Sequence, residues 1–337
     1  MKKNPTVYLN SSQSNSLKQW SALCITLLCL LGVILLGVGL GSVPISLAEV
    51  VQALFRRGEE LNQTIVWDLR LPRVLLGVLV GAALGVAGSL MQGMLRNGLA
   101  DPFLLGISAG AGLAAVVPLV RGFMLSWVPL IAWGGAIGTT ALVYALSWSA
   151  NGISIPRLIL SGVAVSAFFG SLTSMLLLFA DERVQVALNW LVGSLNGRGW
   201  DEVNVVAVYI GIGILLSISL AKFLNLLSLG DELAVSLGVS LKWMRLGIGL
   251  TSAGLTAAAV SVSGLIGFVG LVVPHLARLL VGKDYLWVVP MSGLVGALLL
   301  TGADTLARLG SVELPVGTVT ALIGAPFFVW LLAKRSS

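Results

Sequence analysis

Long uncharged stretches separated by short charged segments dominate the chain. A membrane-spanning helix needs ~20 mostly apolar residues, and eight stretches supply about that length without Lys, Arg, Asp or Glu in their interiors. The pattern therefore predicts spanning helices at 20–41, 74–95, 102–120, 125–148, 158–180, 203–221, 285–303 and 314–333. A turn is expected at Ser149, Asn151 and Gly152, after the fourth of these helices.

A ninth stretch, 246–274, is 29 residues long and admits two interpretations. It forms one long span, or a full helix and a short helix separated near Ser261–Gly264. Cytoplasmic loops carry the excess of Lys and Arg. Two helices here place 12 of the 20 basic residues inside and 8 outside, whereas one helix gives 9 and 11. The charges thus favour ten helices with both termini in the cytoplasm.

Composition agrees with a membrane protein. Apolar residues make up 57% of the 337, and charged residues only 10%, against ~25% in soluble domains. This balance excludes a soluble enzyme and a disordered chain. We expect an all-α integral membrane protein with a flexible cytoplasmic tail at 1–18 and a single domain at 19–337. The 41 glycines suggest helices that pack closely in lipid.

Catalytic and cofactor chemistry is not expected in this chain. The sequence has no GxxxxGK[ST] loop for ATP phosphates, and its one His and two Cys make a zinc site improbable. Asp304 is the only acid expected deep in the membrane, and Arg308 follows it by one helical turn. We expect an ion pair near the outer interface; the alternative is a coupling carboxylate of a carrier.

The largest cytoplasmic loop, 222–245, contains a short amphipathic segment. Leu229, Leu233 and Leu237 recur every four residues and predict an apolar stripe on one helix. Gly230 and Asp231 suit its start, since an Asp accepts bonds from free N–H groups, and Gly238 suits its end. The pattern alone fits two roles equally: a helix lying on the membrane surface, or a lever that enters a groove on a separate ATPase.

At this loop, together with motifs from Ile65 to Leu332, the chain resembles the permease subunits of bacterial ABC importers for iron-siderophores, haem and vitamin B12. The motifs are RLPR (70–73), GAALGVAGSLMQGMLRNGLADPFLLGISAGA (81–111), LSLGDELAVSLGV (227–239), GFVGLVVPHLARLLVG (267–282), ADTLAR (303–308) and LPVGTVTALIGAPFF (314–328). One departure is Gly98, because the family usually has Asn-Pro-Leu-Ala where this chain has Asn97-Gly98-Leu99-Ala100. Glycine keeps the turn but loosens it.

The resemblance implies a type II ABC importer permease fold with ten transmembrane helices per subunit. It implies a second permease subunit, expected to be an identical copy, and two ATPase subunits that bind ATP and Mg²⁺. A periplasmic or lipid-anchored substrate-binding protein is also implied, and the location is the bacterial inner membrane, in contact with lipid. No nucleic-acid partner is expected.

The resemblance also assigns roles to residues of this chain. It favours contact with the ATPase for the loop segment, whose expected coupling residues are Leu229, Gly230, Asp231, Glu232, Leu233, Ala234, Leu237 and Gly238. Arg70, Arg73 and Arg308 are expected to be exposed on the outer side and to dock the binding protein, since an arginine fork suits a carboxylate; snorkelling at the interface is the alternative.

The cytoplasmic gate is expected at Asn97 and Leu99, with Ser154 opposite, although a purely structural turn competes with this role. Gln92, inside the second helix, is expected to bridge helices rather than to contact substrate. Asp101 and Pro102 are expected to begin the third helix.

The function expected from the sequence is import driven by ATP hydrolysis in separate subunits. The leading cargo is an Fe³⁺-siderophore chelate, followed by vitamin B12 and haem, and no residue decides among them. An ion-coupled carrier that works alone is the alternative from another class, and a structural membrane subunit without a pathway is a third.

Overall fold

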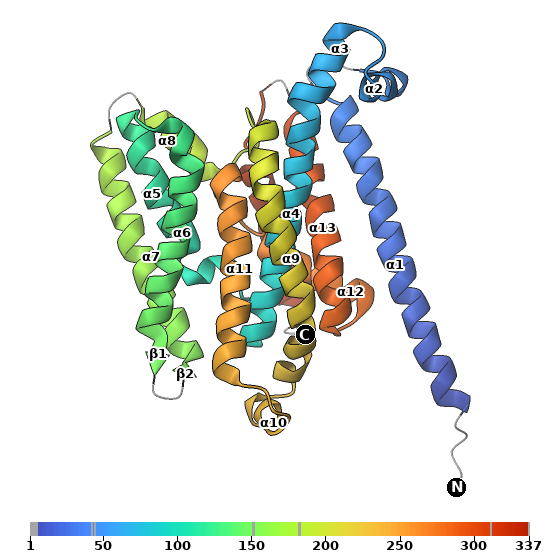
Figure 1. The fold of residues 1–337 in the computed structure, drawn as a ribbon, viewed down its shortest axis with the longest axis vertical. Coiled ribbons are helices and arrows are strands. Elements are labelled where there is room, and N and C mark those ends of the chain that lie inside the picture. The colour runs from blue at the N-terminus through green and yellow to red at the C-terminus, as the bar shows by residue number, and fades with distance from the viewer. Residues whose placement is uncertain are drawn as a thin grey trace.

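The computed structural model describes residues 6–41, 43, 45–149, 152–180, 183–310 and 312–335, which form a bundle of helices (Figure 1). The long helices are α1 (Thr6–Gly39), α4 (Leu71–Leu95), α6 (Val128–Ser147), α7 (Ile155–Leu178), α9 (Trp200–Ser228), α11 (Leu241–Ser263), α13 (Tyr285–Ala307) and α14 (Val316–Arg335), and α5 (Ile107–Arg121) and α12 (Val269–Val281) are shorter. The remaining helices are α2 (Leu47–Leu54), α3 (Glu60–Thr64), α8 (Val184–Val192), α10 (Asp231–Ser236), the π-helix η1 (Ile65–Arg70) and the 3₁₀ helices η2 (Pro102–Leu105) and η3 (Leu125–Trp127).

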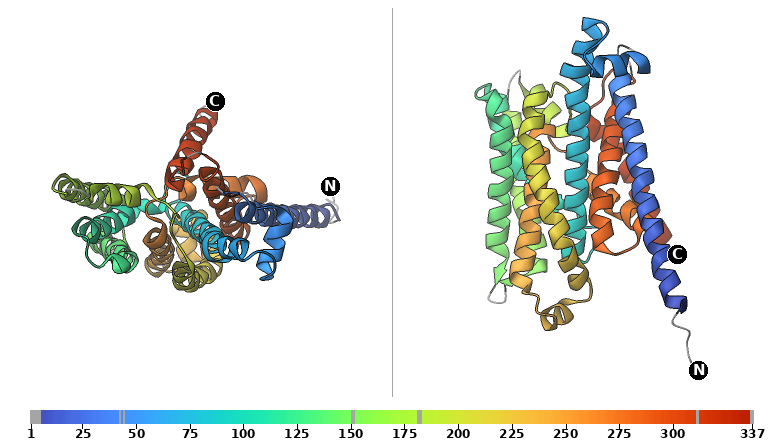
Figure 2. Two further views of the ribbon diagram at one scale, coloured as in Figure 1. Left: turned by 90° about the horizontal axis from the view of Figure 1, so that it is seen from above. Right: turned by 45° about the vertical axis from the view of Figure 1, so that its right-hand side comes forward.

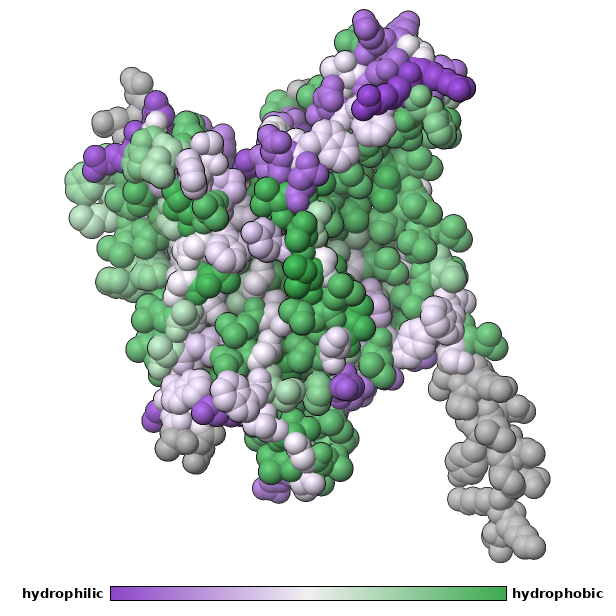
Figure 3. All heavy atoms as spheres, in the orientation of Figure 1, coloured by the Kyte–Doolittle hydropathy of each residue, from purple (hydrophilic) through white to green (hydrophobic). Residues whose placement is uncertain are grey.

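The all-α membrane class is confirmed. Within the described residues, seven helices are long and apolar enough to cross a membrane, and three further apolar helices, 107–121, 269–281 and 316–330, are shorter. Figure 3 shows the same feature on the surface, where apolar residues cover the middle of the bundle and polar residues gather toward its two ends. The ten crossings inferred from the charges remain a prediction.

The break expected in the 246–274 stretch is present. Helix α11 ends at Ser263 and α12 begins at Val269, and the residues between them are not helical. Phe268 turns the chain into α12 with a left-handed φ of 67°. Because α12 has 13 residues, it is about 20 Å long and is shorter than the ~30 Å apolar core of a bilayer.

Several boundaries differ from the predicted ones. Helix α1 begins at Thr6, so residues 6–18 of the expected tail are helical and continuous with the first span. The sequence has no proline or glycine between Pro5 and the apolar run that would interrupt a helix. Residues 1–5 lie outside the described part. The second span was expected to start at 74, but helical structure runs without a gap from Glu60 to Leu95. Charged residues marked the end of the apolar run in the sequence, but two of them find acceptors within the fold: Arg70 donates to backbone carbonyl oxygens and Arg73 pairs with Asp304.

A short hairpin replaces part of the turn expected after the fourth span. Strand β1 (Trp148–Ser149) pairs antiparallel with β2 (Gly152–Ile153). Asn151 lies outside the described residues. The hairpin and α10 lie at one end of the bundle, here called the α10 end, and α2, α3 and α8 lie at the opposite end, the α8 end (Figure 1).

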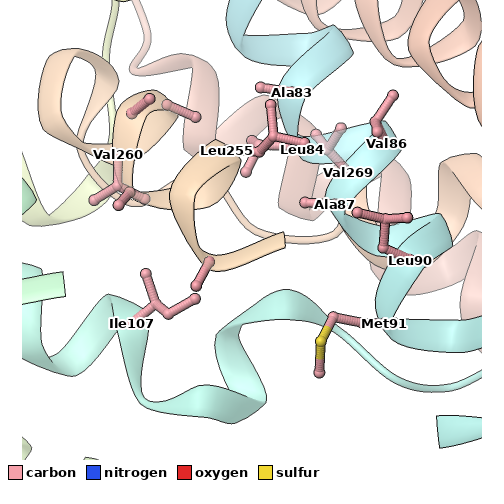
Figure 4. Packing of buried hydrophobic residues seen from close by; sticks show 14 of the residues in the cluster. Ala83, Leu84, Val86, Ala87, Leu90, Met91, Ile107, Leu255, Val260 and Val269 are labelled. Atoms are coloured by element: carbon pink, nitrogen blue, oxygen red, sulfur yellow. The ribbon is translucent and has the colours of Figure 1, made fainter. Parts of the chain in front are cut away.

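Helix α4 forms the centre of the bundle. It packs against α9, α11, α12 and α13, and Figure 4 shows part of this core, where Leu84, Leu90, Leu255 and Val269 are almost fully buried. Gly81 of α4 lies so close to Gly296 of α13 that a Cβ on either would collide with the carbonyl oxygen of the other. Viewed along the bundle, α1 and α14 stand at the periphery (Figure 2).

Candidate functional site

The α10 end carries the amphipathic segment identified in the sequence. Gly230 precedes α10 with φ 113° and Gly238 follows it with φ 84°, so both glycines adopt the turn conformations expected of them. The helix itself is shorter than the leucine stripe, because Leu229 and Leu237 lie at its flanks. All three stripe leucines are more than half exposed. Ala234 is fully buried on the face that packs against the bundle.

Asp231 has a different partner from the expected one. Its carboxylate makes no capping bond at the start of α10. It forms ion pairs with Arg96, at the end of α4 (3.0 Å), and with Arg245 of α11 (2.7 Å). Arg245 also donates to the carbonyl oxygen of Ile153 in β2 (3.3 Å). We call Arg96, Asp231 and Arg245 the inner ion cluster; it joins α10 to the end of α4 and to the hairpin.

The loop after α4 is held by its own backbone and by one side chain. Arg96 adopts a left-handed φ of 50° and ends α4, and the Asn97 Oδ1 accepts a bond from the Leu99 N–H (3.0 Å). Gly98 is not among the glycines with positive φ, so this turn does not need the conformational freedom that glycine adds. Leu99 is 43% exposed.

The expected start of the third span is confirmed, although it takes the form of a 3₁₀ turn. The Asp101 Oδ1 accepts a bond from the Phe103 N–H (2.8 Å), and Pro102 is the first residue of η2. Burial raises the pKa of Asp101 to about 6, although the bond from Phe103 lowers it.

Gln92 bridges two helices, as expected. Its amide donates to the carbonyl oxygen of Leu271 in α12 (3.1 Å), and its Oε1 accepts a bond from Arg278. Gln92 and Asn97 line one cavity of about 400 Å³ at the α10 end. Ser154 and Leu99 do not line that cavity; Ser154 precedes α7 and donates its N–H to the Ser147 carbonyl oxygen (3.3 Å).

At the α8 end, the three arginines expected to be exposed are largely enclosed. Arg70 and Arg73 are 6% and 8% exposed, and the side chain of Arg308 is also 8% exposed. Arg70 donates to the carbonyl oxygens of Val38 (2.9 Å) and Gly39 (2.8 Å) at the end of α1. The expectation of exposure was wrong, because the chain itself supplies acceptors that no sequence pattern indicated.

Asp304 is at the centre of these side chains. We call Arg70, Arg73, Arg308, Asp304 and Glu313 the outer arginine cluster. Arg73 binds Asp304 through two nitrogens, Nε to Oδ2 (3.0 Å) and Nη2 to Oδ1 (2.8 Å). The expected pair with Arg308 is also present (3.3 Å), and Glu313 binds the remaining nitrogen of Arg73 (2.5 Å). Removing one partner of a buried ion pair typically costs ~3–5 kcal/mol, because the remaining charge is left without a partner.

Apart from the Asp304–Arg308 pair, sequence reasoning missed the partners in both clusters. Arg245, Arg96 and Glu313 were charges at helix ends in the sequence, and their pairing depends on how distant helices meet. The Arg73–Asp304 pair joins residues 231 positions apart, so no local spacing could have indicated it.

Within the described residues the helices form a membrane bundle with short connections and no soluble domain, and α10 lies at one end with exposed leucines beside it. Residues 28–334 match the model of the FecCD transport family, and the chain belongs to this family. It is a permease of the ABC importer type.

Relatives in this family carry different cargoes. The chain is 42% identical over 305 residues to the Fe(3+)-citrate import system permease protein YfmD of Bacillus subtilis, covering 89% of this chain and 90% of that protein. It is 41% identical over 278 residues to the cobalamin import system permease protein BtuC of Halobacterium salinarum, covering 82% and 75%. A solved inward-facing structure of a metal-chelate type ABC transporter is 33% identical, with a TM-score of 0.84 over 93% of this chain and 98% of that chain.

Proposed function

We propose that two copies of this chain enclose a pathway across the bacterial inner membrane. Two separate ATPase subunits bind at the α10 end, and a substrate-binding protein delivers cargo at the α8 end. The observation that carries the proposal is the exposed leucine stripe of Leu229, Leu233 and Leu237, which leaves apolar area on a helix anchored by ion pairs. An apolar helix face is a common means of entering a groove on a partner protein.

The inner ion cluster supports a coupling role for this segment. Because Asp231 is paired with Arg96 and Arg245, a displacement of α10 acts on the end of α4 and on α11. The turn that follows α4 carries Asn97 and the exposed Leu99, which we propose as gate residues with Ser154 opposite. ATP-driven movement of α10 would thereby open this gate while the outer one closes.

Substitution Leu233→Asp tests the coupling role. Leu233 is 55% exposed, so its replacement leaves the bundle intact but places a charge where an apolar groove is proposed. We expect ATP-driven uptake to fall at least tenfold while membrane insertion stays normal, because burying an unpaired carboxylate at an interface costs several kcal/mol. Val235→Asp is the matched control, since Val235 is 54% exposed and points away from the stripe on the same helix. Normal uptake by the Leu233→Asp variant would contradict the assignment.

The outer arginine cluster is our proposed docking site for the binding protein. Arg70, Arg73 and Arg308 line a cavity of about 540 Å³ at the α8 end together with Glu313. Glu313 is the most exposed carboxylate of the cluster, with 36% of its side chain accessible. A carboxylate of the arriving protein would thus meet arginines that are already oriented, which favours encounter more than affinity.

We propose an Fe³⁺ chelate of the siderophore type as the cargo. The Fe(3+)-citrate permease among the relatives supports this choice, and the cobalamin permease keeps vitamin B12 as the second candidate; haem is the third. An ion-coupled carrier is disfavoured, since both oxygens of Asp304 are occupied by arginines. Uptake of each labelled cargo by a deletion strain carrying the gene, with and without ATP depletion, separates these outcomes. Uptake that survives loss of the ATPase would favour the carrier.

A further inference from the structure

A cavity at the α10 end is lined by an unusual concentration of positive charge. Its volume is about 400 Å³; the cations Arg96, Arg278 and Lys283 contribute to its walls, and the imidazole of His275 lies beside them. No Asp or Glu is among the described residues that line it. Sites for small ligands typically have ~300–1,000 Å³, so the cavity has room for an anionic group.

Two carboxylates lie beside the basic residues of the cavity. Asp231 pairs with Arg96, which lines the cavity, and also with Arg245, which does not. Asp284, next to Lys283, accepts bonds from the Asn225 side chain (2.6 Å) and from the Leu286 N–H at the start of α13 (2.9 Å). Arg96, Arg278 and Lys283 thus set three positive charges against these two carboxylates, one of which is shared with Arg245, and polar atoms of Gln92 and Tyr285 lie beside them.

Other basic residues at this end are arranged differently. Lys222 lies over the ring of Phe223 (5.0 Å) and Lys242 over that of Trp148 (4.8 Å), and neither lines the cavity. An excess of Lys and Arg on one side of a membrane protein explains basic residues scattered over a surface. It does not explain several of them converging on one hollow between helices.

The cavity lies at the level of the membrane interface. Trp20 of α1 packs edge-on against Trp287 in the first turn of α13 (5.1 Å between ring centroids). Gln19 donates to the carbonyl oxygen of Val281, the last residue of α12 (2.9 Å). Because tryptophans concentrate at the level of lipid headgroups, this pair marks the level at which α12 ends and α13 begins.

Apolar side chains border the same cavity. Leu279 is 70% exposed and lines it, and Leu280 and Leu286 are 50% and 51% exposed on the adjoining turns of α12 and α13. A site that joins positive charge to exposed apolar surface at the interface matches a phospholipid, whose phosphate and acyl chains need both. A free anion has no apolar part that could contact the exposed leucines.

We propose that this cavity binds the phosphate headgroup of an anionic phospholipid, with the acyl chains lying along Leu279, Leu280 and Leu286. Basic pockets between helices at the cytoplasmic side are a known means of headgroup recognition. Arg278, which is also bonded to Gln92, would connect the lipid to α4 and to the turn proposed as the gate. The binding site itself does not depend on which cargo is transported.

The test is lipid binding to the full chain, delipidated in a non-ionic detergent and followed by native mass spectrometry. The probes are phosphatidylglycerol, phosphatidylcholine with the same acyl chains, and inorganic phosphate as competitor. The variant Lys283→Gln removes one exposed charge of the cavity, and Lys222→Gln removes an exposed charge from the same end outside it. A basic residue near a lipid surface contributes ~1 kcal/mol, so we expect phosphatidylglycerol to bind about fivefold more weakly to Lys283→Gln and unchanged to Lys222→Gln.

Three results would overturn the proposal. They are equal affinity for the two lipids, equal loss in the two variants, and displacement of phosphatidylglycerol by millimolar phosphate, which would identify a free-anion site. Because Lys283 and Lys222 are both exposed, neither variant is expected to disturb folding, and the thermal unfolding midpoint in detergent verifies this. Lipid binding can fail while ATP-driven uptake is normal, so this result is independent of the proposed transport function.

Discussion

At the residue scale, burial within the fold decides which partners the carboxylates of this protein have. Asp304 and Asp101 are both carboxylates that the fold takes away from water, and they have different partners. Asp304 forms ion pairs with Arg73 and Arg308. Asp101 meets a backbone N–H but no cation in the described contacts, and burial raises its pKa to about 6.

The raised pKa of Asp101 makes the free energy of unfolding depend on pH. Between the ordinary pKa of 3.8 and the folded value of about 6, the folded protein holds a proton on Asp101 that the unfolded chain releases. The free energy of unfolding therefore falls as pH rises through this window. Asp101→Asn keeps the capping oxygen and removes the ionisation, so we expect it to be more stable at pH 7 by on the order of 2 kcal/mol.

The measurement is the thermal unfolding midpoint in detergent at several pH values across this window. The variant should lose the part of the pH dependence that belongs to Asp101. Glu232→Gln, which removes an exposed carboxylate at the same end, serves as control and should follow the parent protein. Identical slopes for Asp101→Asn and the parent would show that the carboxyl is not the source.

At the scale of elements, α4 sets the packing of the neighbouring helices because it contacts them through small residues. Gly81 and Gly296 bring the backbones of α4 and α13 into contact, and Gly88 does the same with Gly270 of α12. Close approach through small residues is the usual basis of helix association in membranes. The Arg73–Asp304 pair joins the same two helices, α4 and α13, nearer the α8 end.

Gly81→Ala tests this contact. The added Cβ would collide with the Gly296 carbonyl oxygen, which belongs to backbone and cannot rotate away. We expect a loss of about 2–3 kcal/mol in stability, seen as a lower thermal midpoint in detergent. Gly134→Ala adds the same methyl group in α6 with no atom within 4 Å and should be neutral. Equal midpoints for both variants would contradict the close packing of α4 and α13.

At the scale of the whole molecule, the two ends of the bundle differ in their proposed partners. The α10 end carries the exposed leucine stripe and the basic cavity, whereas the α8 end carries the enclosed arginine cluster. The charge count predicts that the α10 end faces the cytoplasm, with 12 of 20 basic residues on that side.

Labelling of single cysteines tests this orientation. With Cys24 and Cys29 replaced by alanine, Ser236→Cys marks the α10 end and Glu59→Cys the opposite end, and both native residues are exposed. A membrane-impermeant maleimide should label Ser236→Cys only in inside-out vesicles and Glu59→Cys only in vesicles of the native orientation. Intact cells supply the control for vesicle sidedness. The reverse pattern would show that the charges were assigned to the wrong sides.

The class of protein, the approximate helices and the break between α11 and α12 follow from the sequence alone. These depend on local properties: uncharged length, and small or polar residues such as Ser263 and Gly264 where a helix stops. The glycine ends of α10 and the start of η2 at Asp101 also follow from the sequence, because caps are built from neighbouring residues.

Which charged side chains are buried, and which partners they have, depends on how the helices pack together. The start of the second span at Glu60, the enclosure of Arg70 and Arg73, and the role of Asp231 all depend on contacts between distant helices. The basic cavity likewise exists because α4, α9, α12 and α13 end at one level. A charge in a sequence is read as a boundary of the membrane, whereas in the fold a partner from another helix lowers the cost of burying it.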